Sequence, residues 1–138
     1  MQYWLLKTEP EAFSWEDLLR EQQSHWDGVR NYQARNNLKS MEKGDLAFFY
    51  YSGKQKGIVG VVEITSSYYQ DPTTEDERWV AVTVEARERF KGIISLKTIK
   101  EDPELTKMVL VRNSRLSVQS VSASEFAHIK KIAGGSNG

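Results

Sequence analysis

The sequence predicts an α+β domain: a small curved sheet of about six mixed or antiparallel strands, or an open β-barrel, with short helices at its ends. Three observations favour this class. Apolar runs of strand length are separated by gaps too short for repeated helical crossovers between parallel strands. Helical stripes are few and short, which argues against a helical bundle and a regular parallel α/β plan. The chain has 138 residues, enough for one domain with its own hydrophobic core.

Charge and composition limit the classes of function. The 19 basic and 19 acidic residues cancel, which argues against a protein that coats DNA by bulk electrostatics, although a local basic patch stays compatible. Cysteine is absent, so disulfides and thiolate chemistry are excluded, which is compatible with a reducing cytosol. We expect a cytoplasmic location and, separately, a monomer. No apolar run approaches the roughly 20 residues that span a bilayer, and the N-terminus does not resemble a signal peptide, so we expect no membrane partner.

The first elements are a strand and a short helix. Residues 3–8 form an apolar run that ends before Pro10, which cannot continue a ladder, so we expect a buried strand. Ser14 suits the N-cap of a helix that ends near Gln23. Residues 25–30 contain an Asp-Gly pair and are expected to form a loop.

A second helix is expected after Asn31, whose side chain can cap it. Ala34, Leu38 and Met41 follow at helical spacing and form one apolar stripe. Residues 46–52 and 58–65 are strand-like and flank a Gly- and Lys-containing turn, which predicts a hairpin. The polar segment 67–77 then reads as a loop.

Residues 79–90 alternate in the manner of a half-buried strand. Val80, Val82 and Val84 share one face, which places Trp79 on the opposite face. There the indole either packs under a helix or forms the second wall of an aromatic slot with Trp26.

The C-terminal third is expected to hold short elements. Residues 95–100 and the segment from Asp102 predict two helical turns, and residues 109–111 and 116–121 predict strands or extended segments. Ser122 begins a capping box for the last helix. We expect a single domain over residues 1–133 and a disordered tail at 134–138.

The residue types for catalysis or metal binding are not grouped in the sequence. His25 and His128 lie far apart and cysteine is absent, so no spaced set of metal ligands is present and we expect neither a metal nor a cofactor. The chain has no G-x-S-x-G nucleophile elbow and no glycine-rich phosphate loop. We therefore expect no catalytic residue.

The segment 26–37 is the richest in binding groups. It offers the indole of Trp26, the guanidinium groups of Arg30 and Arg35, and several side-chain amides beginning with Asn31. Amides and guanidiniums can read the hydrogen-bonding edge of a base, and an indole can stack on its face. The alternative is that Trp26 fills the core, Asn31 only caps a helix, and the arginines are solvated.

Two further segments carry suitable groups. The strand end at Ser52 is followed by Lys54, and this turn could approach a phosphate or simply keep a sheet edge soluble. Arg112 and Arg115 could hold phosphates, or their neighbours could only cap short elements. Both interpretations stay open in each case.

Several blocks of the sequence resemble the EVE domain. Tyr-Trp-Leu-Leu-Lys-Thr-Glu-Pro at 3–10 is similar to the family's opening, and Trp-Asp-Gly-Val-Arg-Asn-Tyr-Gln-Ala-Arg-Asn at 26–36 to its longest conserved block. The blocks at 44–45, 48–52, 57–61 and 114–119 follow in the family's order. Two departures are visible: Ser120 stands where the family usually has proline, and the loop 68–78 looks shorter than in eukaryotic members.

The resemblance implies a PUA-like fold, related to YTH domains that hold methyladenine in an aromatic cage. It implies a pocket for a modified base of DNA or RNA: methylated or hydroxymethylated cytosine, or methyladenine. Trp26, Asn31 and Ser52 match family positions near that pocket, and Tyr32 and Trp79 are further assignments. We add Arg30, Lys7, Arg35 and Lys54 as predicted contacts to phosphates or base edges.

The expected function is capture of a modified base by a binding module, without chemistry. Two alternatives stay open. One is an enzyme or accessory domain that acts on modified nucleic acid, and the other is a small-molecule or protein-interaction module on the same fold.

Overall fold

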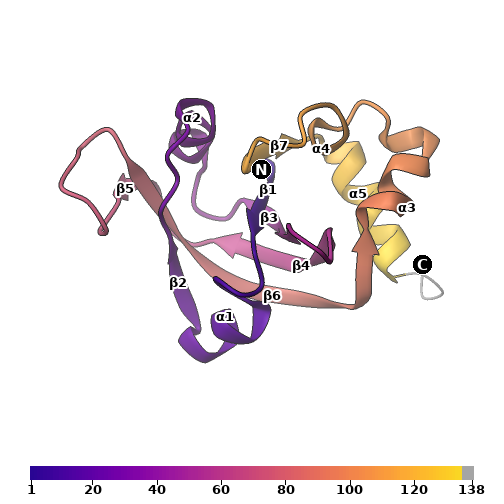
Figure 1. The fold of residues 1–138 in the computed structure, drawn as a ribbon, viewed down its shortest axis with the longest axis horizontal. Coiled ribbons are helices and arrows are strands. Elements are labelled where there is room, and N and C mark those ends of the chain that lie inside the picture. Colours follow the sequence, from indigo (N-terminus) through magenta and orange to yellow (C-terminus); the bar gives the residue numbers. More distant parts are fainter. Residues whose placement is uncertain (135–138) are drawn as a thin grey trace.

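The computed structural model describes residues 1–134, which form one α+β unit around a single open sheet (Figure 1). Its seven strands are β1 (Tyr3–Thr8), β2 (Gln23–Trp26), β3 (Leu46–Tyr51), β4 (Gly57–Ile64), β5 (Tyr69–Gln70), β6 (Val80–Ser95) and β7 (Val118–Val121). The helices are α1 (Trp15–Glu21), α2 (Tyr32–Ser40), α3 (Leu96–Glu101), the 3₁₀ helix η1 (Pro103–Leu105), α4 (Val109–Arg112) and α5 (Ala123–Gly134). This confirms the predicted α+β class.

The strand order is β2-β6-β4-β3-β1-β7, with β5 added beside β6. Most neighbours are antiparallel, and β1 and β3 form the parallel pair. Within the described residues β2 and β7 are the edges of the path and do not pair with each other, so the sheet stays open. β6 runs the length of the molecule and bends up beside α3 (Figure 1).

Both faces of the sheet are covered, because alternate residues of the central strands are apolar on both sides. In β1, Trp4 and Leu6 join one buried cluster and Leu5 joins the other. The first cluster lies under α1 and α2, and the second lies under α3, α4 and α5. Burial on both faces explains why β1 reads as a continuous apolar run.

The predicted caps form as expected. The Ser14 hydroxyl accepts from the Asp17 backbone N–H at 3.1 Å, and Asp17 returns the bond to the Ser14 N–H at 2.9 Å. Ser122 and Glu125 make the equivalent pair at the start of α5. The predicted β3–β4 hairpin is also present.

Asp45 is a buried charged residue that organises the N-terminal end of the sheet. Its carboxylate accepts from the Trp4 indole N–H at 3.0 Å and from the backbone N–H groups of Gln2 and Glu42 at 3.1 and 3.0 Å. Gly44 precedes it with φ of 99°, a conformation that favours glycine. The Gly-Asp pair therefore fixes the turn between α2 and β3.

Two local predictions were wrong. Residues 109–111 form helix α4 instead of a strand, because one helical turn directs Val109 toward the first core cluster while Leu110 is fully buried in the second. Residues 25–26 belong to strand β2 instead of a loop, since Ser24 and Trp26 alternate with exposed residues and pair with β6. The sheet also gains the two-residue β5 inside the predicted loop.

The predicted tail at 134–138 lies outside the described residues except for Gly134, which ends α5. In residues 1–134 no helix has the length and hydropathy needed to cross a membrane.

Candidate functional site

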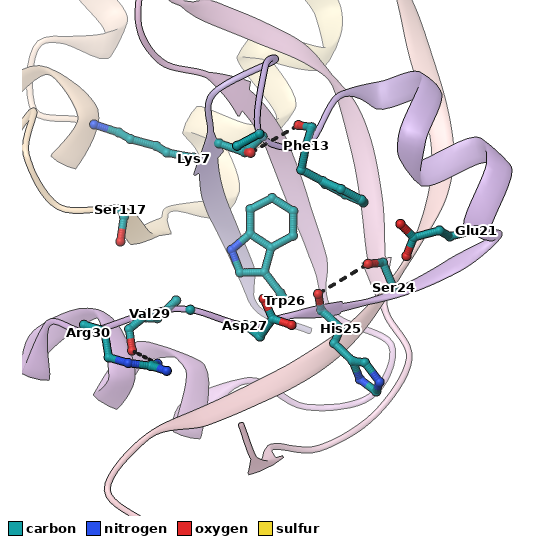
Figure 2. A pocket seen from close by; sticks show the side chains of 13 residues that line it. Lys7, Phe13, Glu21, Ser24, His25, Trp26, Asp27, Val29, Arg30 and Ser117 are labelled. Atoms are coloured by element: carbon teal, nitrogen blue, oxygen red, sulfur yellow. Dashed lines mark hydrogen bonds between the residues drawn. The ribbon is translucent and has the colours of Figure 1, made fainter. Parts of the chain in front are cut away.

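A cavity of about 520 Å³ opens beside the β2 edge of the sheet (Figure 2). Its walls come from the end of β1, the segment before α1, β2, residues 27–30 and Ser117. This volume falls in the range of small-molecule sites, roughly 300–1,000 Å³. The cavity is therefore large enough for one nucleobase with its sugar.

Trp26, the last residue of β2, forms the aromatic wall of this cavity. Its ring meets Phe13 edge-to-face, with centroids 6.2 Å apart, and meets Phe49 in the same manner at 5.7 Å. The residue is only 7% exposed, yet the indole stands at the centre of the cavity view (Figure 2). These edge contacts fix the orientation of the indole, so Trp26 serves both the core and the cavity.

Polar groups of both signs surround the indole. Lys7 reaches the cavity from β1, donates to the Ser114 carbonyl, and has its ammonium 5.4 Å from the Tyr50 ring centre. Burial lowers the pKa of the Lys7 ammonium. Asp27 follows Trp26 directly, and burial, together with the nearby charge of Asp71, raises the pKa of its carboxyl.

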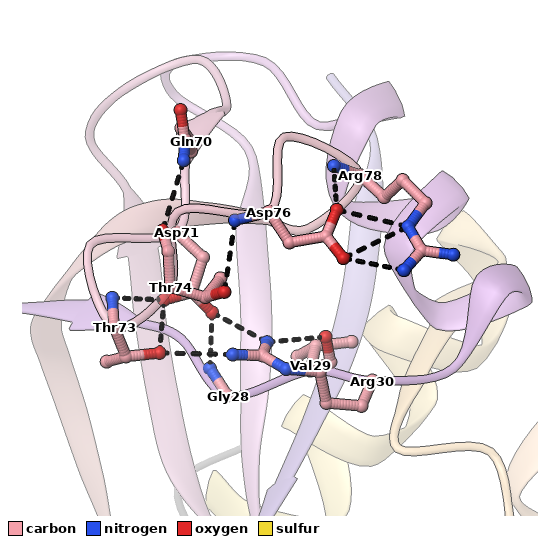
Figure 3. A network of polar contacts seen from close by, with 9 residues as sticks. All are labelled: Gly28, Val29, Arg30, Gln70, Asp71, Thr73, Thr74, Asp76 and Arg78. Carbon is pink, nitrogen blue, oxygen red and sulfur yellow. Dashed lines mark hydrogen bonds and ion pairs between the residues drawn. The ribbon is translucent and has the colours of Figure 1, made fainter.

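The loop 71–73 holds the cavity wall in place through a fully buried carboxylate (Figure 3). Asp71 accepts from the Gly28 N–H at 2.8 Å, from the Arg30 guanidinium at 2.9 Å, and from the Thr73 N–H and hydroxyl at 2.7 and 2.6 Å. Burial alone would raise the pKa of Asp71, but these bonds from Thr73, Arg30 and Gly28 outweigh it and lower the pKa to about 2. Gly28 has a φ of 75°, a conformation that favours glycine, and its N–H is bound by Asp71. Both features fix the turn after β2.

Arg30 connects the cavity to the surface beside it. Besides Asp71, its guanidinium contacts the Val29 carbonyl at 3.0 Å and the Thr73 hydroxyl at 3.2 Å. The same group lies 5.6 Å from the centre of the Trp79 ring. Arg30 therefore belongs to the predicted segment and lines the cavity, as Lys7 and Trp26 do.

Asn31 caps α2 and does not line the cavity. Its side-chain oxygen accepts from the Ala34 N–H at 2.9 Å, the expected N-cap bond. Asn31 follows Arg30, a cavity residue, but its side-chain oxygen is already used by the helix.

Tyr32 and Trp79 pack against each other instead of against Trp26. Their ring centroids are 5.2 Å apart with an interplanar angle of 32°, and neither residue lines the cavity. Arg35 covers the Tyr32 ring at 4.9 Å. Of the two alternatives left open for Trp79, the structure shows packing against a helix residue and no aromatic slot with Trp26.

The remaining predicted contacts lie elsewhere. The Ser52 N–H donates to the Thr8 carbonyl at 2.9 Å, and the Ser52 side chain does not line the cavity. Lys54 borders a second hollow of about 570 Å³ near α3. Arg112 ends α4, and Arg115 lies two residues before Ser117. Both residues are exposed and neither lines the cavity.

The sequence pattern missed several cavity residues. Phe13 and Ser117 lie in short connections that carry no periodic signal. Asp71, which does not line the cavity but holds Gly28 and Arg30 in its wall, lies in a polar loop beside a proline and was missed as well. Asp27 was present in the recognised segment but was interpreted only as part of a turn. Its place directly after Trp26 was the available signal for a polar group beside the indole.

His128 is partly buried at the far end of the molecule. Its Nε2 lies 2.7 Å from an Asp102 carboxylate oxygen and its Nδ1 lies 3.1 Å from a Glu104 oxygen. Both ring nitrogens thus have carboxylate partners, which join α5 to η1.

The open bent sheet, the parallel β1–β3 pair and the aromatic cavity at its edge define an α+β domain with a ligand-sized cavity, in agreement with the PUA-like fold that the resemblance implies. Comparison with protein families narrows this class. The model of the EVE domain matches residues 2–132, and the chain belongs to the EVE domain family.

Three relatives illustrate the similarity. Thymocyte nuclear protein 1 of Mus musculus is 38% identical, with 94% of this chain and 73% of that protein covered. A crystal structure of an Agrobacterium tumefaciens protein has 40% identity, a TM-score of 0.93, and coverage of 100% of this chain and 97% of that one. The crystal structure of the human THYN1 protein in complex with DNA containing 5-methylcytosine has 34% identity, a TM-score of 0.90, and coverage of 96% and 98%.

A more distant structure shares the fold alone. The YTH domain of a Zygosaccharomyces rouxii protein superposes with a TM-score of 0.62 at 18% identity, covering 96% of this chain and 86% of that one. The expected structural relation to YTH domains is thereby confirmed.

Proposed function

We propose that this chain is a binding module that captures a chemically modified base of a nucleic acid in the cavity beside Trp26. The observation that carries the proposal is the indole itself, which borders a cavity large enough for a base. The human relative crystallised with DNA containing 5-methylcytosine supports it, because that protein is 34% identical over nearly its whole chain.

The groups around the indole suit the edge of a base. The Asp27 carboxylate can accept from the exocyclic amino group of cytosine or adenine, as acidic side chains do when they read cytosine. Lys7 and Arg30 supply donors for a ring carbonyl or a phosphate. A base carrying both an amino group and a carbonyl, as cytosine does, matches this set of donors and acceptors.

The raised pKa of Asp27 gives the proposal a pH dependence. A carboxylate accepts two hydrogens from an amino group better than a protonated carboxyl, and burial shifts protonation of Asp27 toward higher pH. Affinity for an amino-bearing base should therefore fall as the pH drops through the raised pKa, and Asp27→Ala should abolish that fall.

Recognition of a methyl group is modest in energy. Burying one methyl contributes about 0.8 kcal/mol, or about fourfold in affinity, so shape exclusion and hydrogen bonding must supply the rest of the selectivity. Flipping a paired base costs a few kcal/mol, which favours single-stranded or mismatched sites. With a net charge of zero the salt dependence of binding should be shallow.

A binding panel tests the proposal. Fluorescence polarisation would compare labelled single strands that differ in one base: cytosine, 5-methylcytosine, 5-hydroxymethylcytosine, adenine or N6-methyladenine, as DNA and as RNA. We expect one modified base to bind at least about fourfold tighter than its parent. An equal affinity across the panel would overturn the assignment.

Two variants locate the binding to the cavity. Ser117→Phe introduces a bulky side chain at the cavity wall, and Trp26→Leu removes the aromatic wall while keeping an apolar side chain. Both should lose the preference for the modified base, whereas Leu19→Ala, at an exposed position of α1, should keep it. Unchanged binding in folded Ser117→Phe would favour a protein-interaction or small-molecule module instead.

We further infer that the module binds without altering the base. Two cavity side chains that could supply a nucleophile or a base are held by other bonds: the Ser24 hydroxyl donates to the His25 carbonyl at 3.3 Å, and the His25 ring contacts the Tyr69 hydroxyl at 2.5 Å. Mass spectrometry of the modified oligonucleotide after incubation should show an unchanged base, and a new product would establish an enzyme. A cytoplasmic location stays a prediction, which imaging of the tagged chain would test.

A further inference from the structure

Two aromatic rings, one exposed and one partly exposed, lie at the surface beside the cavity and outside both core clusters. Tyr32, the first residue of α2, is 52% exposed, and Trp79 precedes β6 and is partly exposed. Their rings form a tilted pair with centroids 5.2 Å apart. Large rings left at the surface in a group mark a binding surface more often than scattered single ones do.

Three guanidinium groups surround this pair. Arg35 covers the Tyr32 ring at 4.9 Å, and Arg30 and Arg78 lie 5.6 and 5.9 Å from the Trp79 ring centre. Arg78 also donates to the Tyr32 hydroxyl at 3.1 Å. We call Tyr32, Trp79, Arg30, Arg35 and Arg78 the Arg–aromatic platform.

The three guanidinium groups of the platform are held in place by hydrogen bonds to neighbouring side chains and carbonyls. Asp76 binds the Arg78 guanidinium through both carboxylate oxygens, at 3.0 and 2.6 Å (Figure 3). Asp71 holds Arg30, and Arg35 donates to the Asn36 side chain at 2.7 Å and to the Arg78 carbonyl at 3.3 Å. Such bonds reduce the entropy lost when a ligand orders the surface.

The platform is continuous with the cavity through Arg30. This residue lines the cavity and also lies over Trp79, so one side chain touches both places. A strand whose base enters the cavity beside Arg30 therefore has the platform within reach of its neighbouring nucleotide. Aromatic faces stack on bases of any sequence, and arginines contact phosphates, so the groups on this surface fit a nucleotide.

We propose that the Arg–aromatic platform binds the nucleotide next to the captured base, with its base stacked on the aromatic and guanidinium faces of the platform and its phosphate on Arg35 or Arg78. This rests on the proposed function, since the captured base sets the position of the strand. It assigns a second contact to the nucleic acid, one that reads the presence of a neighbouring base and not the modification.

Abasic neighbours test the proposal directly. Kd values would be measured for two oligonucleotides with the same modified base, one with ordinary neighbours and one with abasic sites on both sides. Wild-type protein should bind the abasic form at least about fivefold more weakly, as loss of one stacked base predicts. Tyr32→Ala and Trp79→Ala should weaken binding to the ordinary oligonucleotide by a similar factor and should not weaken binding to the abasic one further.

Matched variants control for folding and for the hydroxyl. Tyr32→Phe keeps the ring and loses only the bond to Arg78, so it should bind like wild type within about twofold if stacking dominates. Urea midpoints would verify that each variant is folded. Acrylamide quenching gives a second readout: Trp4, Trp15 and Trp26 are at most 7% exposed, so the quenchable signal comes from Trp79, and nucleic acid should shield it.

The outcomes separate this proposal from the one on which it rests. If folded Tyr32→Ala and Trp79→Ala bind both oligonucleotides as wild type does, the platform assignment is wrong while modified-base capture stands. If wild type shows no preference for any modified base but still loses affinity with abasic neighbours or on Tyr32→Ala, the platform stands and base capture is wrong. If wild type binds no oligonucleotide at all, both are overturned.

Discussion

Replacing Asp71 by asparagine removes one buried charge and keeps the size of the side chain. The carboxylate is fully buried and accepts from Gly28, Arg30 and Thr73, so it ties the cavity wall to the loop before β6. An amide oxygen can still accept some of these bonds, but its NH₂ group meets donors where the second carboxylate oxygen stood. We expect Asp71→Asn to destabilise the fold and to weaken base binding by loosening residues 28–30.

The size of the effect follows from the pKa of Asp71. The bonds from Thr73, Arg30 and Gly28 hold it at about 2 against an ordinary value of 3.8. Each tenfold change in an acid dissociation constant corresponds to about 1.4 kcal/mol, so the ionised carboxylate contributes about 2 kcal/mol to the free energy of unfolding at neutral pH. Because the folded pKa is the lower one, this contribution is complete above the unfolded value of 3.8 and is lost as the pH falls toward 2. At pH 3 roughly half of it should be gone.

Urea unfolding of wild type and Asp71→Asn at pH 7 and pH 3 measures this directly. The difference in unfolding free energy should be about 2 kcal/mol at pH 7 and roughly half of that at pH 3. Asp76→Asn is the matched control, because Asp76 lies on the same loop but its ion pair with Arg78 is exposed, and we expect a smaller loss. A difference for Asp71→Asn that is the same at both pH values would refute the reasoning.

Three further changes have clear expected outcomes. Asn31→Ala should lower the free energy of unfolding by about 1 kcal/mol by removing the cap of α2, and Asn31→Ser should restore most of it in urea titrations. Tyr51→Phe should cost about 1–3 kcal/mol, because the Trp15 backbone N–H, which donates to the Tyr51 hydroxyl at 2.8 Å, is left unsatisfied in the core; an unchanged urea midpoint would contradict this. Gly60→Ala should lower the thermal midpoint strongly, since a Cβ there would stand within 3.0 Å of the Glu88 carbonyl oxygen, whereas Gly92→Ala, with open space around it, should have little effect.

Elements with local determinants were predictable. Local residues determine three elements: the cap at Ser14, the cap at Asn31 and the β3–β4 hairpin. Each depends on residues within a few positions of each other, so the local sequence is enough to predict it. The apolar run of β1 was equally clear, since burial on both faces leaves a continuous signal.

Short elements at the edges were not predictable, because contacts distant in sequence determine them. β2 has four residues with three polar ones among them, and its strand conformation comes from pairing with β6. Helix α4 has β-branched residues that favour a strand, and packing of Leu110 into the core overrides that preference. β6 extends to Ser95 because it pairs with β2, β4 and β5 along its length.

For the site, the sequence indicated the segment but not its partners. Strand alternation places Trp79 opposite the valines, and that geometry is correct, yet alternation does not determine which ring lies over that face. The ring that packs on Trp79 is that of Tyr32, the first residue of α2. Asp71 carried no pattern at all, although it fixes Gly28 and Arg30.

Because Trp26 serves both the core and the cavity, its replacement alone cannot distinguish folding from recognition. Removing a largely buried tryptophan to alanine costs about 3–5 kcal/mol, a large part of the roughly 5–15 kcal/mol that stabilises a typical domain. Loss of binding in such a variant would follow from unfolding as readily as from a lost stacking contact. Ser117 lines the cavity and takes no part in the contacts of Trp26 with Phe13 and Phe49, so a bulky side chain there acts on the ligand's space while those contacts remain. Loss of selectivity in Ser117→Phe at an unchanged unfolding free energy would therefore assign recognition to the cavity and not to a change in folding.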